Sequence, residues 1–379
     1  MSRSRRALDR PAVLWTSAIV VSLVAGAAVL VPMAASGAVD LPDKTVEELI
    51  EFAGASEVDA LSGTIEQTSE LGLPDLGALT GSMGGTEGAA DDESAADIDD
   101  LIALVTGSHT AKVYVDGESA RLQVLDRLGE RNVYVDGAAG EIWFVDSETQ
   151  TATKLNLPAD EAEAPDAPDA SDTLPTPDQM LDEALTRLDE STEVTVGTDS
   201  RVAGRDVYEL ILVPRTADTL VGEVRFAIDG ENGVALAASV TPRGASEPAF
   251  EIAFTQVDFT AADAAVFAFA PGPDIAVTEK DITPTDHEGT KTDTAAPVVF
   301  GDGWSAVVEL PDTTEAGEQN VFSGLDPEQL AMLESVTTGV DGGRVAQTAL
   351  VSVLITDDGR VLVGAVPASR LVEAAQTGR

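Results

Sequence analysis

The chain uses one pattern twice: a short amphipathic helical segment followed by a run of strands separated by turns. The first round begins at 44–53 and continues through LSGTIEQTSEL (61–71) and hairpins at 110–155. The second begins with PDQMLDEALTRLD (177–189) and continues through strands at 192–269. Single helices beside long antiparallel meanders are typical of one large sheet with helices against one face. We therefore expect a mainly β, α+β fold whose curved sheet encloses an apolar space.

Period-two alternation marks the strands of the first round, as a sheet with one apolar face requires. The alternating apolar pairs are Val113 and Val115, Leu122 and Val124, Val133 and Val135, and Ile142 and Phe144. Asp116-Gly117 and Asp136-Gly137 are typical hairpin turns. Trp143 and Phe144 are adjacent, so we expect one in the core and the other on the opposite face.

The second round starts with a helix whose apolar residues share one side, which predicts packing on a sheet. These residues are Met180, Leu181, Ala184, Leu185 and Leu188. Thr176 before Pro177 fits an N-cap followed by proline at the first helical position. We expect strands at 192–197, 206–214, 220–229, 234–241 and 249–259, with FAFA (267–270) as a further strand. DGENG (229–233) predicts a tight turn and not a binding site.

Composition predicts the boundaries between the parts of the chain. Residues 1–38 form an export signal or anchor, 40–275 form the main domain, and 276–299 form a linker. Within the main domain, 72–107 is an acidic, Gly/Ala-rich insertion and 157–177 is a solvated Pro/Asp/Ala connector. Residues 300–379 form a small α+β module, with a helix at 325–336 and a hairpin at 345–366 that turns at Thr356–Arg360.

The N-terminus predicts export. Arg3, Arg5, Arg6 and Arg10 precede the apolar run 12–31, and Ser36, Gly37 and Ala38 follow it. The positive flank keeps residue 1 in the cytoplasm and sends the rest outside. The run is close to the ~20 residues that span a hydrocarbon core, so a cleaved signal and a retained anchor both stay open. SRRALDR also loosely resembles a twin-arginine signal.

Chemistry-bearing patterns are scarce. The chain has no cysteine, which excludes disulfides, thiol nucleophiles and lipid modification at cysteine. Its two histidines, His109 and His287, fit structural or surface roles, and no nucleotide or nucleophile-elbow motif occurs. The acidic run at 91–100 lacks the glycine of a calcium loop and reads as a solvated charge run, with weak cation binding as the alternative. The net charge of −45 disfavours nucleic acid as a partner. We expect no enzyme activity, no cofactor and no metal.

Three stretches together resemble the actinobacterial LolA-like family. They are LSGTIEQTSELGLPDL, the run from TAKVYVDGES to TQTATKL, and VAGRDVYELILVPRTADTLVGEVRFAID, and the resemblance covers about residues 44–270. That family is named for the outer-membrane lipoprotein carrier and is related in fold to a sensor that restrains an envelope-stress anti-sigma factor. The resemblance implies an open, curved antiparallel half-barrel with helices in its concavity, where acyl chains or lipopeptides bind. No basic residue of this sequence matches the carrier's ligand-contacting one.

These observations predict an extracytoplasmic lipid or lipopeptide carrier, membrane-anchored or secreted. The alternative is an envelope-stress sensor that contacts a membrane anti-sigma regulator, and a purely structural envelope protein is a third reading. Leu101, Ile102, Leu104 and Val105 form an apolar cluster at the end of the acidic insertion, and they fit either a lid or ordinary core. The predicted cavity and lid residues are Leu101, Ile102, Leu104, Val105, Val113, Val115, Phe144, Leu181 and Leu185.

Overall fold

A computed structural model describes residues 39, 41–72, 107–125, 129–156, 175–281, 298–310 and 336–377. Several predicted features lie outside these residues: the segment 1–38, the acidic run with Leu101–Val105, nearly all of the connector 157–177, and all but the last residue of the helix 325–336. Within the described part, no helix combines the length and the apolar content that crossing a membrane requires.

The described elements follow the two predicted rounds and add a third group. The first round contains α1 (Val46–Gly54), β1 (Ala60–Ser69), β2 (His109–Asp116), β3 (Ser119–Leu125), β4 (Glu130–Asp136), β5 (Glu141–Asp146) and β6 (Thr151–Asn156). The second contains α4 (Pro177–Thr186), β7 (Thr192–Val196), β8 (Ser200–Val202), β9 (Arg205–Pro214), β10 (Val221–Asp229), β11 (Ala235–Pro242), β12 (Phe250–Asp258), η2 (Ala264–Val266) and β13 (Ala276–Asp281). The third contains β14 (Val298–Phe300), η3 (Gly303–Ser305), β15 (Val307–Glu309), β16 (Thr338–Val340), β17 (Gly343–Gln347), β18 (Ser352–Thr356), β19 (Val361–Gly364) and α6 (Ala368–Thr377).

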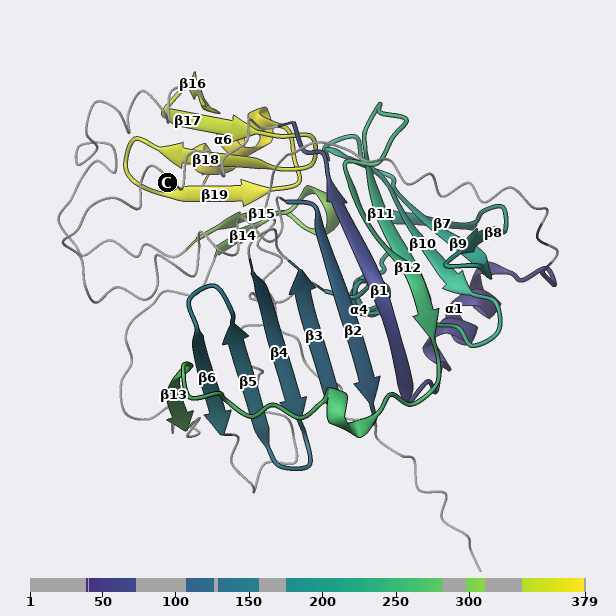
Figure 1. Cartoon of the computed structure of the whole chain (residues 1–379). Helices are drawn as coiled ribbons and strands as arrows, with labels where there is room; N and C mark the ends of the chain where they lie inside the picture. Colours follow the sequence, from purple (N-terminus) through teal and green to yellow (C-terminus); the bar gives the residue numbers. More distant parts are fainter. Residues whose placement is uncertain are drawn as a thin grey trace, which may run out of the picture.

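Both rounds contribute to one 13-stranded sheet, which confirms the prediction of a single sheet across the 157–177 connector (Figure 1). The strand order is β13-β6-β5-β4-β3-β2-β1-β12-β11-β10-β9-β7, with β8 paired to β9. β1 joins the two halves because it pairs with β2 on one side and with β12 on the other. The sheet is open, since β13 and β7 are its two ends. Every pairing is antiparallel except that of β13 with β6.

Two predictions about the end of the main domain are wrong. The expected linker 276–299 begins with strand β13 and ends with the start of strand β14. FAFA (267–270) is not a strand: it follows η2 in a segment that crosses the front of the sheet between β12 and β13 (Figure 1). Phe269 of this segment stacks on Tyr134, with 5.2 Å between the ring centroids, and meets Trp143 edge-on at the same distance.

Both helices of the main domain begin with a capping box. In α1, Thr45 and Glu48 each accept a hydrogen bond from the other's backbone N–H group, and in α4 Thr176 and Gln179 do the same. Pro177 occupies the first turn of α4, as the sequence predicts. Asp178 then accepts a 3.0 Å hydrogen bond from the backbone N–H of Ala235, which fixes α4 on β11. Burial raises the pKa of the Asp178 carboxyl group above its ordinary value.

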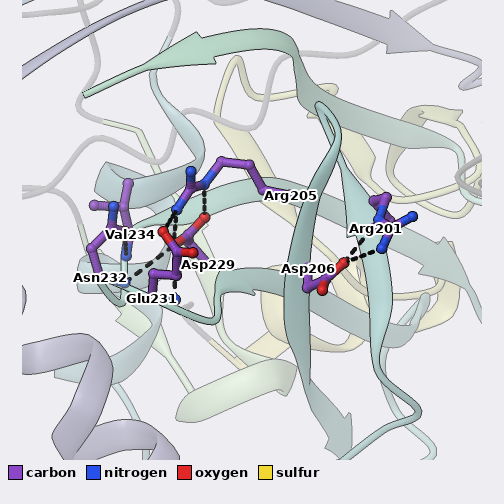
Figure 2. Close-up of polar contacts among 7 residues, drawn as sticks. All are labelled: Arg201, Arg205, Asp206, Asp229, Glu231, Asn232 and Val234. Atoms are coloured by element: carbon purple, nitrogen blue, oxygen red, sulfur yellow. Dashed lines mark hydrogen bonds and ion pairs between the residues drawn. The ribbon is translucent and has the colours of Figure 1, made fainter. Parts of the chain in front are cut away.

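The turn between β10 and β11 is fixed by a buried carboxylate (Figure 2). Asp229 is fully buried, pairs with Arg205, and accepts hydrogen bonds from the backbone N–H groups of Glu231 (3.0 Å) and Asn232 (3.1 Å). Arg205 also pairs with Glu231 at 2.7 Å. The hydrogen bond to Asp229 raises the pKa of the Arg205 guanidinium above its ordinary value. DGENG is therefore a structural turn, as the sequence indicates.

The C-terminal group forms a six-stranded sheet in the order β14-β15-β19-β18-β17-β16, with α6 packed on β18 and β19. The predicted hairpin is present, because β18 pairs with β19 across the turn at Thr356–Arg360. This sheet also docks on the main domain. Leu350 and Val351 belong to the core of the large sheet, and the Trp304 indole N–H donates to the Thr192 hydroxyl at 2.8 Å.

Candidate functional site

The large sheet has one face that carries α1 and α4, which we call the helix-side face. In an antiparallel pair, directly opposite residues point to the same face. The edge-to-face contact of Phe52 on α1 with Tyr208 on β9 places Tyr208 on the helix-side face. Following the register from β9 across to β2 places Val113 on this same face. Val113 and Tyr208 also share one core cluster with Leu49 of α1 and Leu181 of α4.

Two apolar rungs cross this face from β2 to β6. The first rung contains Val113, Leu122, Val133, Phe144 and Thr153, each opposite the next. The second rung contains Val115, Ala120, Val135, Ile142 and Leu155 in the same manner. With neighbouring strands ~4.8 Å apart, the rungs run for about 19 Å across the sheet. The alternation in the sequence predicts this arrangement, since period two and hairpin turns bring all four apolar pairs into register.

The helices cover the two halves of this face unequally. α4 packs on β11, and α1 packs on β7 and β9, so both lie over the second half of the sheet (Figure 1). There the strand residues Leu210, Phe226 and Ile252 are completely buried. On the first half, Leu122, Val133, Val135, Ile142 and Phe144 are only half-buried. We call these five side chains the apolar face.

The sequence-predicted site residues fall into three groups. Val113 and Leu181 are core residues, with 5% and 2% of their surface exposed, and Val115 and Leu185 pack against the same core. Phe144 lies in the first rung, outside that core cluster and half-buried. Leu101, Ile102, Leu104 and Val105 lie outside the described residues. The structure thus places Phe144 beside Leu122, Val133, Val135 and Ile142. These four residues belong to the same alternating apolar pattern in the sequence, but they were not among the predicted cavity residues.

Trp143 lies on the opposite, outer face of the sheet, so the two side chains do point to different faces as predicted, but neither belongs to the buried core, since both are half-buried. Its rung there contains Arg121, Tyr134 and Lys154. The guanidinium of Arg121 lies 4.8 Å from the Tyr134 ring centroid and donates to the backbone carbonyl of Val266, and Phe269 covers Tyr134 and Trp143. Burial raises the pKa of Tyr134. The outer face of this half is therefore covered by the chain's own segment around Phe269.

The apolar face offers van der Waals contact and no reactive group. Among the described residues, no cluster of three or more histidine or acidic side chains has a geometry that could hold a metal ion. A half-buried apolar surface binds by removing apolar area from water, at roughly 25 cal/mol for each Å². Its chemistry therefore fits an apolar ligand.

The main domain thus belongs to the class of open, mainly β sheets with helices on one face. No protein-family model and no curated protein matches the chain. Among solved structures, the chain is similar to MucB in complex with MucA(peri), with 15% identity, 87% of this chain and 96% of that chain covered, and a TM-score of 0.40. The MucA/MucB complex of Pseudomonas aeruginosa gives 14% identity, coverage of 86% and 94%, and a TM-score of 0.40.

A third similar structure is the LolA superfamily protein NE2245 from Nitrosomonas europaea. It shares 9% identity, covers 60% of this chain and 99% of its own, and has a TM-score of 0.24. Solved structures similar to this chain thus include a member of the superfamily that the sequence resembles. At TM-scores of 0.40 and below, the likeness carries no argument about what this chain binds.

Proposed function

We propose that the chain is an extracytoplasmic protein that binds acyl chains of a lipid or lipopeptide on the apolar face and catalyses no reaction. The supporting observation is the apolar face, whose five half-buried side chains lie in the two rungs on β3–β5, on the side of the sheet that carries the helices. Burying an acyl chain there contributes ~0.8 kcal/mol for each methylene group. The arginine-rich start of the chain and its apolar run at 12–31 support a location outside the cytoplasm.

Native mass spectrometry of the purified protein, before and after lipid extraction, tests this function directly. We expect an added lipid mass before extraction and rebinding of a fatty acid afterwards. A bound acyl chain is released only when a membrane or partner protein accepts it, because a carrier of this kind has no energy source of its own. A protein that never carries lipid mass and takes up no fatty acid would contradict the proposal.

Adjacent substitutions on opposite faces locate the binding surface. Phe144→Ala removes an aromatic ring from the apolar face, and we expect the affinity for a fluorescent fatty acid to fall about tenfold or more. Trp143→Ala is the matched control, because its ring lies against Phe269 on the outer face. Equal loss of affinity in both variants would place binding elsewhere.

Leu181→Ala instead removes core packing, and we expect it to lower the free energy of unfolding by about 2–5 kcal/mol.

A sensor that contacts a membrane regulatory protein is the second candidate. The observation that favours it is strand β14, which lies at the end of the six-stranded sheet with Val298 and Val299 50% and 57% exposed. Strands at a sheet edge pair readily with a strand of another protein. An adjacent sigma-factor or anti-sigma gene would favour this function, whereas a transporter or lipid-synthesis neighbour would favour the carrier.

A further inference from the structure

The segment between β12 and β13, residues 260–275, crosses the outer face of the first half of the large sheet (Figure 1), and we call it the strap. No side chain of the strap is buried. Among the described residues, its polar and aromatic attachments to the strands beneath come from two places. The Arg121 guanidinium donates to the backbone carbonyl of Val266 at 3.4 Å, and the Phe269 ring packs on Tyr134 and Trp143.

β13 continues the strap and ends the large sheet. It pairs with β6 in a parallel register, from Ala276 opposite Thr151 to Asp281 opposite Asn156. From Ala276 to Glu279 its side chains are exposed. Backbone hydrogen bonds therefore hold β13 with little burial of apolar surface to support them. Since no residue of the strap or of β13 belongs to the core cluster of the large sheet, both can open locally at low free-energy cost.

Beneath Phe269, one rung of the outer face carries Arg121, Tyr134, Trp143 and Lys154, each opposite the next. The Arg121 guanidinium lies 4.8 Å from the Tyr134 ring centroid, and the Lys154 ammonium lies 5.6 Å from that of Trp143, so a cation flanks each ring. Phe269 stacks on one ring and meets the other edge-on, which are the arrangements that aromatic pairs prefer. The rung is therefore a seat for one aromatic side chain.

The strap and β13 contact the sheet as a peptide ligand contacts a receptor. When a peptide adds a strand to a sheet edge, its main-chain hydrogen bonds give affinity and a pocket for a side chain gives specificity. Here β13 pairs with the edge of β6, and Phe269 fills the seat. The chain's own segment thus shows which chemistry this surface accepts: an aromatic side chain followed by a short strand.

We propose that the strap and β13 are an exchangeable occupant, and that this outer surface binds an extended segment of a partner protein that carries a phenylalanine ahead of a short strand. The partner's strand displaces β13 when its side chains bury more apolar surface than AVTEKD does. This inference goes beyond the proposed function, which uses the opposite face of the sheet. Until a partner arrives, the strap keeps Tyr134 and Trp143 covered.

The test uses the full chain and a fluorescently labelled synthetic peptide with the chain's own sequence 260–281. In the parent protein the strap competes with this peptide from within the molecule, at an effective concentration on the order of millimolar. Phe269→Ala removes the competing ring from the seat, so we expect this variant to bind the peptide about tenfold or more tightly than the parent by fluorescence anisotropy. A peptide in which alanine replaces Phe269 should lose that gain.

Phe267→Ala is the matched control, because it removes a ring from the same segment, whereas the ring contacts of the strap among the described residues are those of Phe269. This variant should bind the peptide as weakly as the parent. Equal peptide affinity for the parent and Phe269→Ala, or no binding to either, would overturn the inference. Equal affinity for the peptide that lacks the phenylalanine would overturn it as well.

Hydrogen exchange of the parent protein gives an independent measurement that needs no variant. We expect the amides of β13 to exchange about a hundredfold or more faster than those of β3 and β4, because the strap and β13 open without the rest of the sheet. Exchange of β13 as slow as that of β3 and β4 would show that the strap does not leave its seat, and the surface beneath would then be closed to any partner.

Discussion

At the scale of single residues, two arginines four positions apart form ion pairs of different kinds (Figure 2). Arg205 pairs with the fully buried Asp229, whereas Arg201 pairs at 2.6 Å with Asp206, and these two side chains are 37% and 43% exposed. Removing one partner of a buried pair leaves an uncompensated charge, but an exposed pair contributes ~0–1 kcal/mol. Burial therefore decides which pair matters for stability.

We expect Arg205→Leu to lower the free energy of unfolding by about 3 kcal/mol, because the Asp229 carboxylate stays buried without its guanidinium. Arg201→Leu, the matched control, should change it by less than about 1 kcal/mol. Urea denaturation followed by circular dichroism measures both. Similar losses for the two variants would show that Asp229 is satisfied by its backbone donors alone.

At the scale of elements, the sequence predicted what depends on local pattern. Alternation and Asp-Gly turns predict strands β2–β6 and the apolar side that they share. Thr176-Pro177 predicts the capped start of α4. β13 could not be predicted this way, because its AVTEKD sequence has little apolar content and it pairs with β6, more than a hundred residues earlier. FAFA alternates like a strand, but the Phe269 ring packs on Tyr134 instead. The site residues predicted from the sequence include core residues as well as Phe144 of the apolar face, because the same alternation produces both and only the placement of the helices separates them.

Gly63 of β1 shows how a close approach between strands depends on one residue. An added Cβ there would lie 2.4 Å from the backbone oxygen of Gln256 and 2.7 Å from the Phe254 ring. We expect Gly63→Ala to destabilise the protein by about 1–3 kcal/mol, as overpacking does. Gly54→Ala, at the end of α1, should not destabilise it, because an added Cβ there would meet no atom within 4 Å beyond its own helix and its chain neighbours. Thermal unfolding compares the two variants. Equal melting temperatures would show that β12 shifts at little cost to accept the added methyl group.

At the scale of the whole molecule, each sheet has a core of its own, and a loop of the C-terminal sheet packs into the core of the large sheet. Leu350 and Val351 are buried among residues of the large sheet, and backbone hydrogen bonds join Ala349 to Leu71 at 3.0 Å and Leu220 to Ala365 at 2.8 Å. The two sheets therefore have separate cores that are joined by the Leu350–Val351 loop and by these hydrogen bonds. Cooperative units in proteins follow shared packing more closely than chain segments.

We expect both sheets to unfold in one transition, with peptides from β9–β12 and from β17–β19 showing the same opening free energy by hydrogen exchange. Val351→Asp should weaken protection in both, because a buried carboxylate without a partner costs several kcal/mol. Val299→Asp, at an exposed position of the C-terminal sheet, should leave both unchanged. Loss of protection confined to β17–β19 would contradict this coupling between the two sheets.

The central place of β1 constrains the order in which the chain can fold. The Thr255 hydroxyl donates to the backbone carbonyl of Thr64, 191 positions away, whereas β2 to β6 pair with their immediate neighbours in sequence. Contacts between distant segments form slowly, because the closure of a long loop must precede them. The β2–β6 meander can form during synthesis, but β1 lacks its second partner until β12 has emerged. Throughout that interval the edge of β1 is open to pairing with other chains, so a newly made molecule is most prone to aggregate before its second half is complete.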